Sequence, residues 1–147
     1  MSEIKKPGFR LLKGHGSVLS ICSLACLAAI FIGPVNGQDL RKHVNEGNAL
    51  YHDEKFDEAL TRYQDALLDD PRSEVAHFNQ GDALYKLGKY DEAIEAYQKV
   101  IGSKERAMDQ KAFYNIGNVY FQQNKLQESI ESYKKALLIS VSFLFLD

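Results

Sequence analysis

The amino-acid sequence predicts an all-α protein: a right-handed superhelical solenoid of three helix-turn-helix units, preceded by an N-terminal signal or anchor segment. Three stretches align with one another: EGNALYHDEKFDEALTRYQDAL, QGDALYKLGKYDEAIEAYQKVI and IGNVYFQQNKLQESIESYKKAL. Their leading glycines, Gly47, Gly81 and Gly117, are spaced by 34 and 36 residues, which is typical of a helical repeat. The same spacing recurs in Tyr63, Tyr97 and Tyr133.

Each unit is expected to contain two short helices joined by a turn. The units cover residues 40–73, 74–107 and 110–143, and the helices of the first lie near 40–52 and 56–68. Asp57 and Asp91 stand near the start of second helices, where an acidic side chain suits the helix dipole. Pro71 ends the first unit because proline cannot continue a helix.

The glycines within these helix-forming stretches need an explanation. Each should weaken a helix by roughly 0.5–1 kcal/mol relative to alanine. Gly81 is expected on the face of the first helix that meets the second, where a missing side chain permits close approach. Ala93 should do the same from the second helix, and Gly88 should supply positive φ in the turn. The glycines are therefore architectural.

The charge is unevenly distributed along the chain. Residues 1–37 carry four basic side chains and one acidic one, so the remainder has a net charge of −5. A mildly acidic folded part argues against nucleic acid as a partner, since binding it requires a basic face.

Residues 1–37 are interpreted as a signal peptide or a membrane anchor. A basic stretch precedes the uncharged run SVLSICSLACLAAIFIGPV, residues 17–35, and small residues precede a cleavage site after Gly37. The run is also long enough to span a bilayer, so an uncleaved anchor stays open. In both cases the protein is expected to lie outside the cytoplasm. It would be either periplasmic or secreted, or anchored to the membrane by residues 17–35. No other segment is expected to contact the membrane. Both cysteines lie in this run, which leaves no disulfide framework beyond it.

With Gly47, Phe56, Ala59, Tyr63 and Pro71 at matching places in the first unit, the repeats resemble those of the tetratricopeptide repeat (TPR) family. The resemblance covers roughly residues 40–140 and implies a protein-interaction fold. The stretches FNQGDALYK and KAFYNIGNVYFQQNKLQESIESYKKAL are also similar to the repeat protein of bacterial aerotolerance (Bat-type) operons. That finer resemblance implies a complex with a membrane protein that has a von Willebrand factor A domain.

Helical spacing places two polar columns and one aromatic column on the first helices, along the concave side. Amides offer both donors and acceptors to the backbone of an extended peptide or helix, and aromatic rings offer apolar surface. The candidate partner-binding residues are Asn45, Asn48, Tyr51, Asn79, Asp82, Tyr85, Lys111, Asn115, Asn118 and Phe121. For the asparagines, solvation or capping of a neighbouring helix is the alternative, and Tyr85 and Phe121 could instead pack between units.

No catalytic residues, metal ligands or cofactors are expected. The histidines lack a metal-ligand spacing, and His43 and His77 should be packed. Acidic pairs such as Asp53–Glu54 fit solvated helix ends. We therefore expect a non-catalytic protein-protein interaction scaffold at the bacterial cell envelope.

Two competing functions remain. The terminal stretch KKALLISVSFLFLD is apolar where a solenoid end should be polar. We therefore expect either a truncated or atypical C-terminal end, or a homo-oligomer that forms through this end. The other is a clamp for a chaperone's C-terminal carboxylate, as in some members of the resembled family. Lys111 matches that clamp, but Val44 and Asn115 replace two of its cations, which argues against it.

Overall fold

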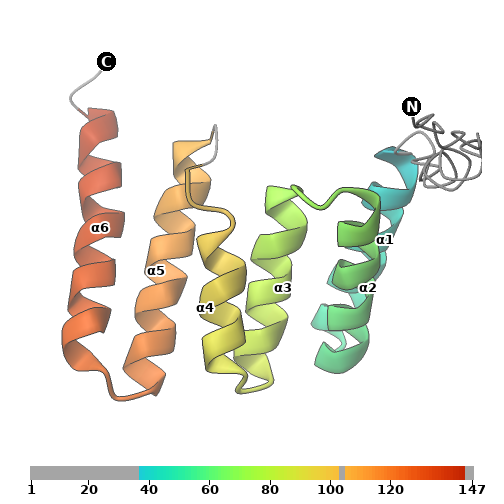
Figure 1. The fold of residues 1–147 in the computed structure, drawn as a ribbon, viewed down its shortest axis with the longest axis horizontal. Helices are drawn as coiled ribbons and strands as arrows, with labels where there is room; N and C mark the ends of the chain where they lie inside the picture. Colours follow the sequence, from blue (N-terminus) through green and yellow to red (C-terminus); the bar gives the residue numbers. More distant parts are fainter. Residues whose placement is uncertain (1–36, 103–104, 145–147) are drawn as a thin grey trace, which may run out of the picture. The chain divides into compact units, whose positions relative to one another are not determined.

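The structure, a computed structural model, describes residues 37–102 and 105–144 of the 147-residue chain. These residues form six helices and no strand, arranged as three antiparallel pairs (Figure 1). The helices are α1 (Gly37–His52), α2 (Phe56–Asp69), α3 (Glu74–Lys86), α4 (Tyr90–Gln98), α5 (Arg106–Gln122) and α6 (Leu126–Leu144). The predicted signal or anchor, residues 1–37, lies outside the described residues except for Gly37. None of the described helices is long and apolar enough to cross a membrane.

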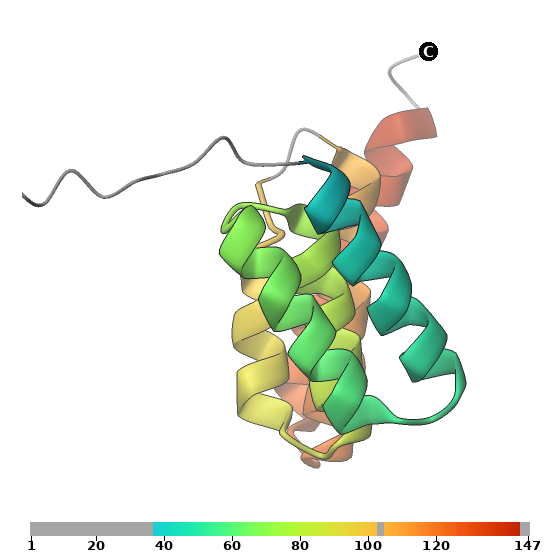
Figure 2. The same ribbon diagram turned by 90° about the vertical axis from the view of Figure 1, so that its right-hand side faces the viewer.

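The first helices of the three pairs lie closer together than the second helices. Within the described residues, α1 contacts α3 and α3 contacts α5, whereas no such contact joins α2 to α4 or α4 to α6. Figure 2 shows α1 and α2 nearest the viewer, with the other pairs behind them. Because α1, α3 and α5 adjoin one another, they line the inner, concave side of the described pairs.

The turn inside each pair contains one residue with positive φ. Gly88 has φ of 73°, which confirms the prediction for this glycine. Glu54 and Asn124 occupy the corresponding turns with φ of 61° and 59°, a backbone conformation that residues other than glycine rarely adopt. The next amide closes each turn: Lys89, for example, donates to the carbonyl of Leu84 at 2.9 Å. These bonds satisfy carbonyls that the end of a helix leaves unpaired.

The leading glycine of each unit lies against the ring of the unit's repeated tyrosine. A Cβ at Gly81 would lie 2.6 Å from the Tyr97 ring, closer than real contacts permit. A Cβ at Gly47 would lie 2.5 Å from the Tyr63 ring, and one at Gly117 would lie 2.5 Å from the Tyr133 ring. The expected close approach of the two helices is therefore confirmed, and a tyrosine ring fills the space that the glycine leaves.

Small residues let the second helices pack tightly against this layer. Ala59 and Ala93 are fully buried, as expected from the repeat. Ser129 takes the same place in the third unit, where its hydroxyl donates to the carbonyl of Gly117 at 2.9 Å. This hydrogen bond satisfies the buried hydroxyl and explains how serine replaces alanine here.

His77 of α3 is also buried, as expected, with its Nε2 3.0 Å from the Pro71 carbonyl oxygen.

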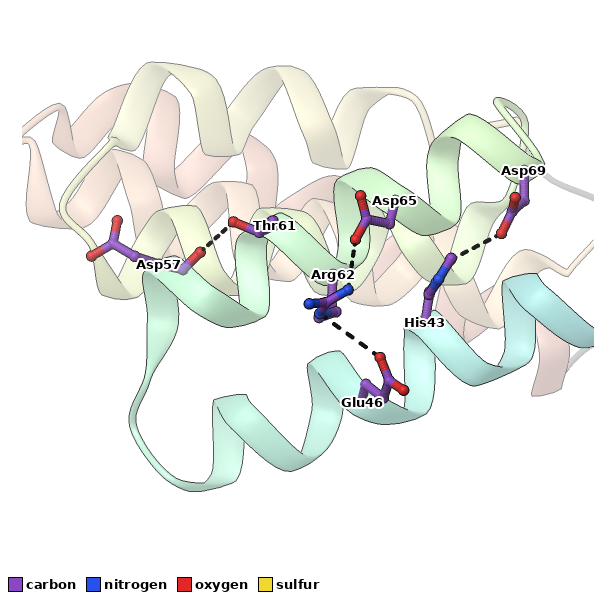
Figure 3. A network of polar contacts seen from close by, with 7 residues as sticks. All are labelled: His43, Glu46, Asp57, Thr61, Arg62, Asp65 and Asp69. Carbon is purple, nitrogen blue, oxygen red and sulfur yellow. Dashed lines mark hydrogen bonds and ion pairs between the residues drawn. The ribbon is translucent and has the colours of Figure 1, made fainter.

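Polar contacts join α1 to α2 on the outer side of the first pair (Figure 3). Arg62 lies 3.7 Å from Glu46 of α1 and 3.0 Å from Asp65 of its own helix. His43 Nδ1 lies 3.0 Å from Asp69 Oδ2. We call this set of contacts the polar face of the first pair.

The last helix presents apolar side chains to solvent. Ile130, Leu137, Leu138 and Val141 of α6 are exposed, and Ile130 is 47% exposed. Its counterparts Leu60 and Ile94 are only 8% exposed. We call these four residues of α6 the apolar face. The expectation of a truncated or atypical C-terminal end stays a prediction.

Candidate protein-interaction groove

Three adjoining hollows lie beside α1, α3 and α5, and the third is also lined by α6. Together they form what we call the concave groove. Their volumes are about 220, 180 and 740 Å³. The first and second share Tyr51 and Asp82, and the second and third share Asn115. Of the predicted partner-binding residues, all but Asn45 and Phe121 line one of these hollows. The structure therefore gathers most of the predicted set into one surface.

A repeated hydrogen-bond pattern forms the polar part of this groove. In each unit the tyrosine hydroxyl of the second helix donates to the side-chain oxygen of the polar residue that follows the glycine. Tyr63 donates to Asn48 Oδ1 at 2.9 Å, Tyr97 to Asp82 Oδ1 at 2.6 Å and Tyr133 to Asn118 Oδ1 at 2.7 Å. Burial of a tyrosine ring requires a partner for its hydroxyl, and this residue supplies one.

The same oxygens also connect consecutive units. Asn79 Nδ2 donates to Asn48 Oδ1 at 2.9 Å, and Asn115 Nδ2 donates to Asp82 Oδ1 at 3.0 Å. One acceptor oxygen thus receives the tyrosine of its own unit and the asparagine of the next. We call this series of five hydrogen bonds the polar ladder.

The polar ladder changes how the asparagine columns are understood. Asn48, Asn79, Asn115 and Asn118 already bond to neighbouring side chains, whereas Asn45 is exposed. These bonds are neither solvation nor helix capping, the two alternatives that the sequence left open, because they join side chains of adjacent helices. Each amide still retains hydrogen-bonding capacity, since an asparagine has two N–H donors and two acceptor lone pairs.

The aromatic column has two different environments. The Tyr85 ring packs against Tyr90 of the same pair, with centroids 5.9 Å apart, and also lines the second hollow. The Tyr51 ring meets Phe56 edge to face at 5.2 Å and lines the first and second hollows. Phe121 is 59% exposed and lines none of the three hollows. Tyr51 and Tyr85 therefore combine packing within their pairs with surface in the groove.

Asp82 carries the carboxylate of the polar ladder. Burial raises its pKa above the ordinary value, while hydrogen bonds from Tyr97 and Asn115 and the nearby Lys86 charge oppose that shift. Burial also raises the pKa of Tyr63 to about 12, with the Asp82 charge as a smaller cause. Ionisation is therefore unfavourable for the buried groups in this part of the groove.

The third and largest hollow is mainly apolar. It lies between α3, α5 and α6, and Lys111 of the predicted set lies at its edge. Its apolar lining consists of Phe78, Ala107, Tyr114, Tyr133, Ala136 and Leu137. Tyr114 and Leu137 are 56% and 62% exposed, so their side chains are open to a ligand. Tyr133 and Leu137 were not predicted, because their place here depends on how α6 lies against α5.

Residues 37–102 and 105–144 contain no group of three or more His, Cys, Asp or Glu side chains positioned to hold a metal ion. The site is instead a long groove of amides, aromatic rings and a few charges. Such a surface can contact backbone and side chains of another polypeptide along its length.

Stacked antiparallel helix pairs with a groove along their first helices define the class of α-helical repeat proteins. Two models described as tetratricopeptide repeat match the chain, over residues 44–110 and 111–141. The chain therefore belongs to the tetratricopeptide repeat family. A comparison with curated proteins finds no match.

Solved structures of similar fold include the crystal structure of MamA, with 25% sequence identity and a TM-score of 0.66. That match covers 71% of this chain and 60% of the MamA chain, so this chain spans less than two thirds of that relative. The first TPR of Spaghetti (RPAP3) bound to the HSP90 peptide SRMEEVD is 25% identical, with a TM-score of 0.65 over 72% of this chain and 82% of that one. A chain of the CopN–Scc3 complex, 22% identical with a TM-score of 0.64, matches over 69% of this chain and 59% of its own length and shows the fold alone.

Proposed function

We propose that this protein is a non-catalytic interaction scaffold that holds an extended or helical segment of a partner protein in the concave groove. The observation that carries the proposal is that the three hollows share lining residues, so that they adjoin one another from α1 to α6. The structure of a similar repeat with an HSP90 peptide supports a peptide ligand for this kind of fold. Exposed Tyr114 and Leu137 give a ligand apolar contacts, and aromatic residues often dominate the energy of protein interfaces.

Binding in the groove can be tested with peptides selected on the wild-type protein from a random heptapeptide display library. Tyr114→Ser removes an exposed ring from the third hollow without opening the core. We expect it to weaken the selected peptides by about tenfold or more, as for other aromatic hot spots. Leu68→Ser is the matched control, because Leu68 is 82% exposed on α2 and lines none of the three hollows.

The concave-groove proposal predicts that Leu68→Ser binds like the wild type. Equal affinities of all three proteins for the selected peptides, or failure to select any peptide, would contradict it. Circular dichroism and thermal unfolding of both variants check that a loss of affinity reflects the surface rather than the fold.

We also propose that the protein acts outside the cytoplasm, within an aerotolerance complex that contains a von Willebrand factor A-domain membrane protein. Support comes from the basic stretch and uncharged run of residues 1–37 and from the resemblance of the second and third repeats. The intact mass of the protein from fractionated cells tests the location. A mass that corresponds to a chain starting at Gln38 fits a secreted form. A full-length mass in the membrane fraction fits an anchor. A full-length protein in the cytoplasm would exclude both.

The alternative function is self-association through the apolar face of α6. The specific observation is Ile130, which is 47% exposed where its counterparts are 8% exposed. We expect Ile130→Glu with Leu138→Glu to shift a concentration-dependent assembly to monomer in sedimentation velocity, and Leu68→Glu to leave it unchanged. A wild-type protein that is monomeric at every concentration would rule out this function.

A further inference from the structure

Asp82 stands at the junction of the first two hollows, and it is the one position of its column where a carboxylate replaces an amide. The corresponding residues of the first and third units are Asn48 and Asn118. Both amides accept the tyrosine hydroxyl through Oδ1, as Asp82 does. An asparagine at residue 82 would therefore serve the polar ladder, so the ladder does not explain the negative charge.

The second oxygen of this carboxylate is available to a ligand. Both hydrogen bonds that reach Asp82 end on Oδ1. Oδ2 receives no hydrogen bond from the described residues. Among those residues, the fully enclosed side-chain atoms without a hydrogen-bond partner are His77 Nδ1 and Gln123 Oε1, and Oδ2 of Asp82 is not among them. Oδ2 is therefore not fully enclosed, and Asp82 lines both the first and the second hollow. No lysine or arginine nitrogen among the described residues lies within 4.0 Å of the carboxylate.

The charge also has a cost to the fold. Because burial raises the folded-state pKa of Asp82 above its unfolded value, the stability linked to this group is present in acid and is lost as pH rises through the folded pKa. The ionised carboxylate is therefore less favourable in the folded protein than a neutral side chain would be. A half-buried charge that lowers stability and lies in a groove is typical of a functional position.

The surroundings of Asp82 fit a cation. Tyr51 and Tyr85 line the same hollow, and aromatic faces attract lysine ammonium and arginine guanidinium groups. Lys86 follows one helical turn later on α3, but its side chain is exposed and forms no ion pair with Asp82. Lys86 is therefore an exposed neighbouring cation that competes for Asp82 without an ion pair in the structure. The third hollow, reached through Asn115, adds apolar surface beside the charged one.

We propose that Asp82, Tyr51 and Tyr85 form a subsite for a lysine or arginine side chain of the partner segment, whose neighbouring apolar residues occupy the third hollow. This inference rests on the proposed function, since it assumes that a segment lies in the concave groove. Charge complementarity identifies the occupant: the carboxylate selects a cationic side chain against an acidic one.

The test uses Asp82→Asn, which copies the residue of the other two units and keeps the oxygen that accepts from Tyr97 and Asn115. We expect peptides selected from the random heptapeptide library on wild-type protein to be enriched in lysine or arginine. Asp82→Asn should weaken them by about tenfold, a typical loss for a partly desolvated charge pair. Replacing the basic residue of such a peptide by uncharged norleucine or citrulline should cause a similar loss on the wild type and little further loss on Asp82→Asn.

Two matched variants sharpen the result. Asp57→Asn removes the same charge from an exposed position on α2 outside the hollows, and it should bind the peptides like the wild type. Lys86→Met removes the competing cation and should bind basic peptides at least as tightly. Asp82→Asn should also unfold at a higher temperature than the wild type at neutral pH, which separates lost affinity from lost structure.

The outcomes distinguish the subsite from the groove itself. Suppose that the selected peptides bind Tyr114→Ser more weakly than the wild type. If these peptides are not enriched in basic residues, or if they bind Asp82→Asn as tightly as the wild type, the subsite is overturned and the proposed function stays intact. Loss of binding in Lys86→Met would make Lys86 the ligand contact and also overturn the subsite. If no peptide is selected, the proposed function fails and the subsite fails with it.

Discussion

The first helix pair and the last helix present different surfaces at the two ends of the described repeats. On the polar face of the first pair, Arg62 contacts Glu46 and Asp65, and His43 contacts Asp69 (Figure 3). On the apolar face of α6, Ile130, Leu137, Leu138 and Val141 are exposed. The helix-turn-helix architecture is the same in both regions, so the difference comes from the side chains and from what covers them.

One repeated position shows what a following unit contributes. Leu60 and Ile94 belong to the buried core and are each 8% exposed, whereas Ile130 is 47% exposed. The rings of Tyr63 and Tyr97 are 2% exposed, whereas Tyr133 is half-buried. A helical hairpin of this kind therefore does not bury its own apolar side; the next pair completes the burial.

The strongest test of this comparison is truncation of the same side chain in two units. Ile94→Ala should lower the free energy of unfolding by about 2–4 kcal/mol, because it removes buried methyl groups and leaves a cavity. Ile130→Ala should lower it by less than about 1 kcal/mol, since half of that side chain is already in solvent. Urea unfolding monitored by circular dichroism measures both. Equal losses would mean that something covers α6 in solution.

The glycine–tyrosine contact gives the next largest effect. Gly81→Ala should cost about 1–3 kcal/mol, because its Cβ would overlap a Tyr97 ring that is buried and hydrogen-bonded. Gly117→Ala should cost less, because the half-buried Tyr133 ring can shift toward solvent. Thermal unfolding of the two variants provides the measurement. A larger loss for Gly117→Ala would contradict this account of the third unit.

The turns permit a smaller and opposite change. Glu54→Gly should stabilise the protein by about 0.5–1 kcal/mol, since glycine adopts the observed positive φ without strain. Gly88→Ala should destabilise it by a similar amount for the same reason. Differential scanning calorimetry can resolve both shifts. A destabilised Glu54→Gly variant would show that this side chain has a role beyond the turn.

The polar face of the first pair should contribute least. Arg62→Met should change the free energy of unfolding by about 0.5 kcal/mol or less, because its ion pairs involve side chains that are one third or more exposed. Any loss should shrink at high salt, which screens exposed charges. Thermal unfolding at low and high sodium chloride concentration measures the difference. A loss that salt does not reduce would point to packing of the arginine stem instead.

Much of the fold was predictable from the repeat. The aligned glycines and tyrosines predicted the helix pairs, and the first pair, expected near residues 40–52 and 56–68, spans 37–52 and 56–69. The positive φ of Gly88 was predicted, but those of Glu54 and Asn124 were not. The alignment places both opposite Gly88, yet neither residue type indicates this conformation. Here the packing of the two helices prevails over the local preference of the residue.

The groove was predictable in outline but not in its hydrogen bonds. Spacing of 3.6 residues per turn was enough to gather the polar columns on one side of the first helices. The bonds of Asn79 and Asn115 depend on the distance between consecutive units, which one sequence does not specify. The repeated tyrosines did carry a signal, because a buried hydroxyl needs a partner. The role of the columns in binding stays a prediction.

The polar ladder has a thermodynamic consequence for any chain that enters the groove. Its tyrosine, aspartate and asparagine side chains are fixed by one another before association, so they have little rotational freedom left to lose. Immobilising a freely rotating side chain at an interface costs roughly 0.5–1.5 kcal/mol. A surface ordered in advance avoids this entropic penalty, so more of the free energy of each new contact contributes to affinity.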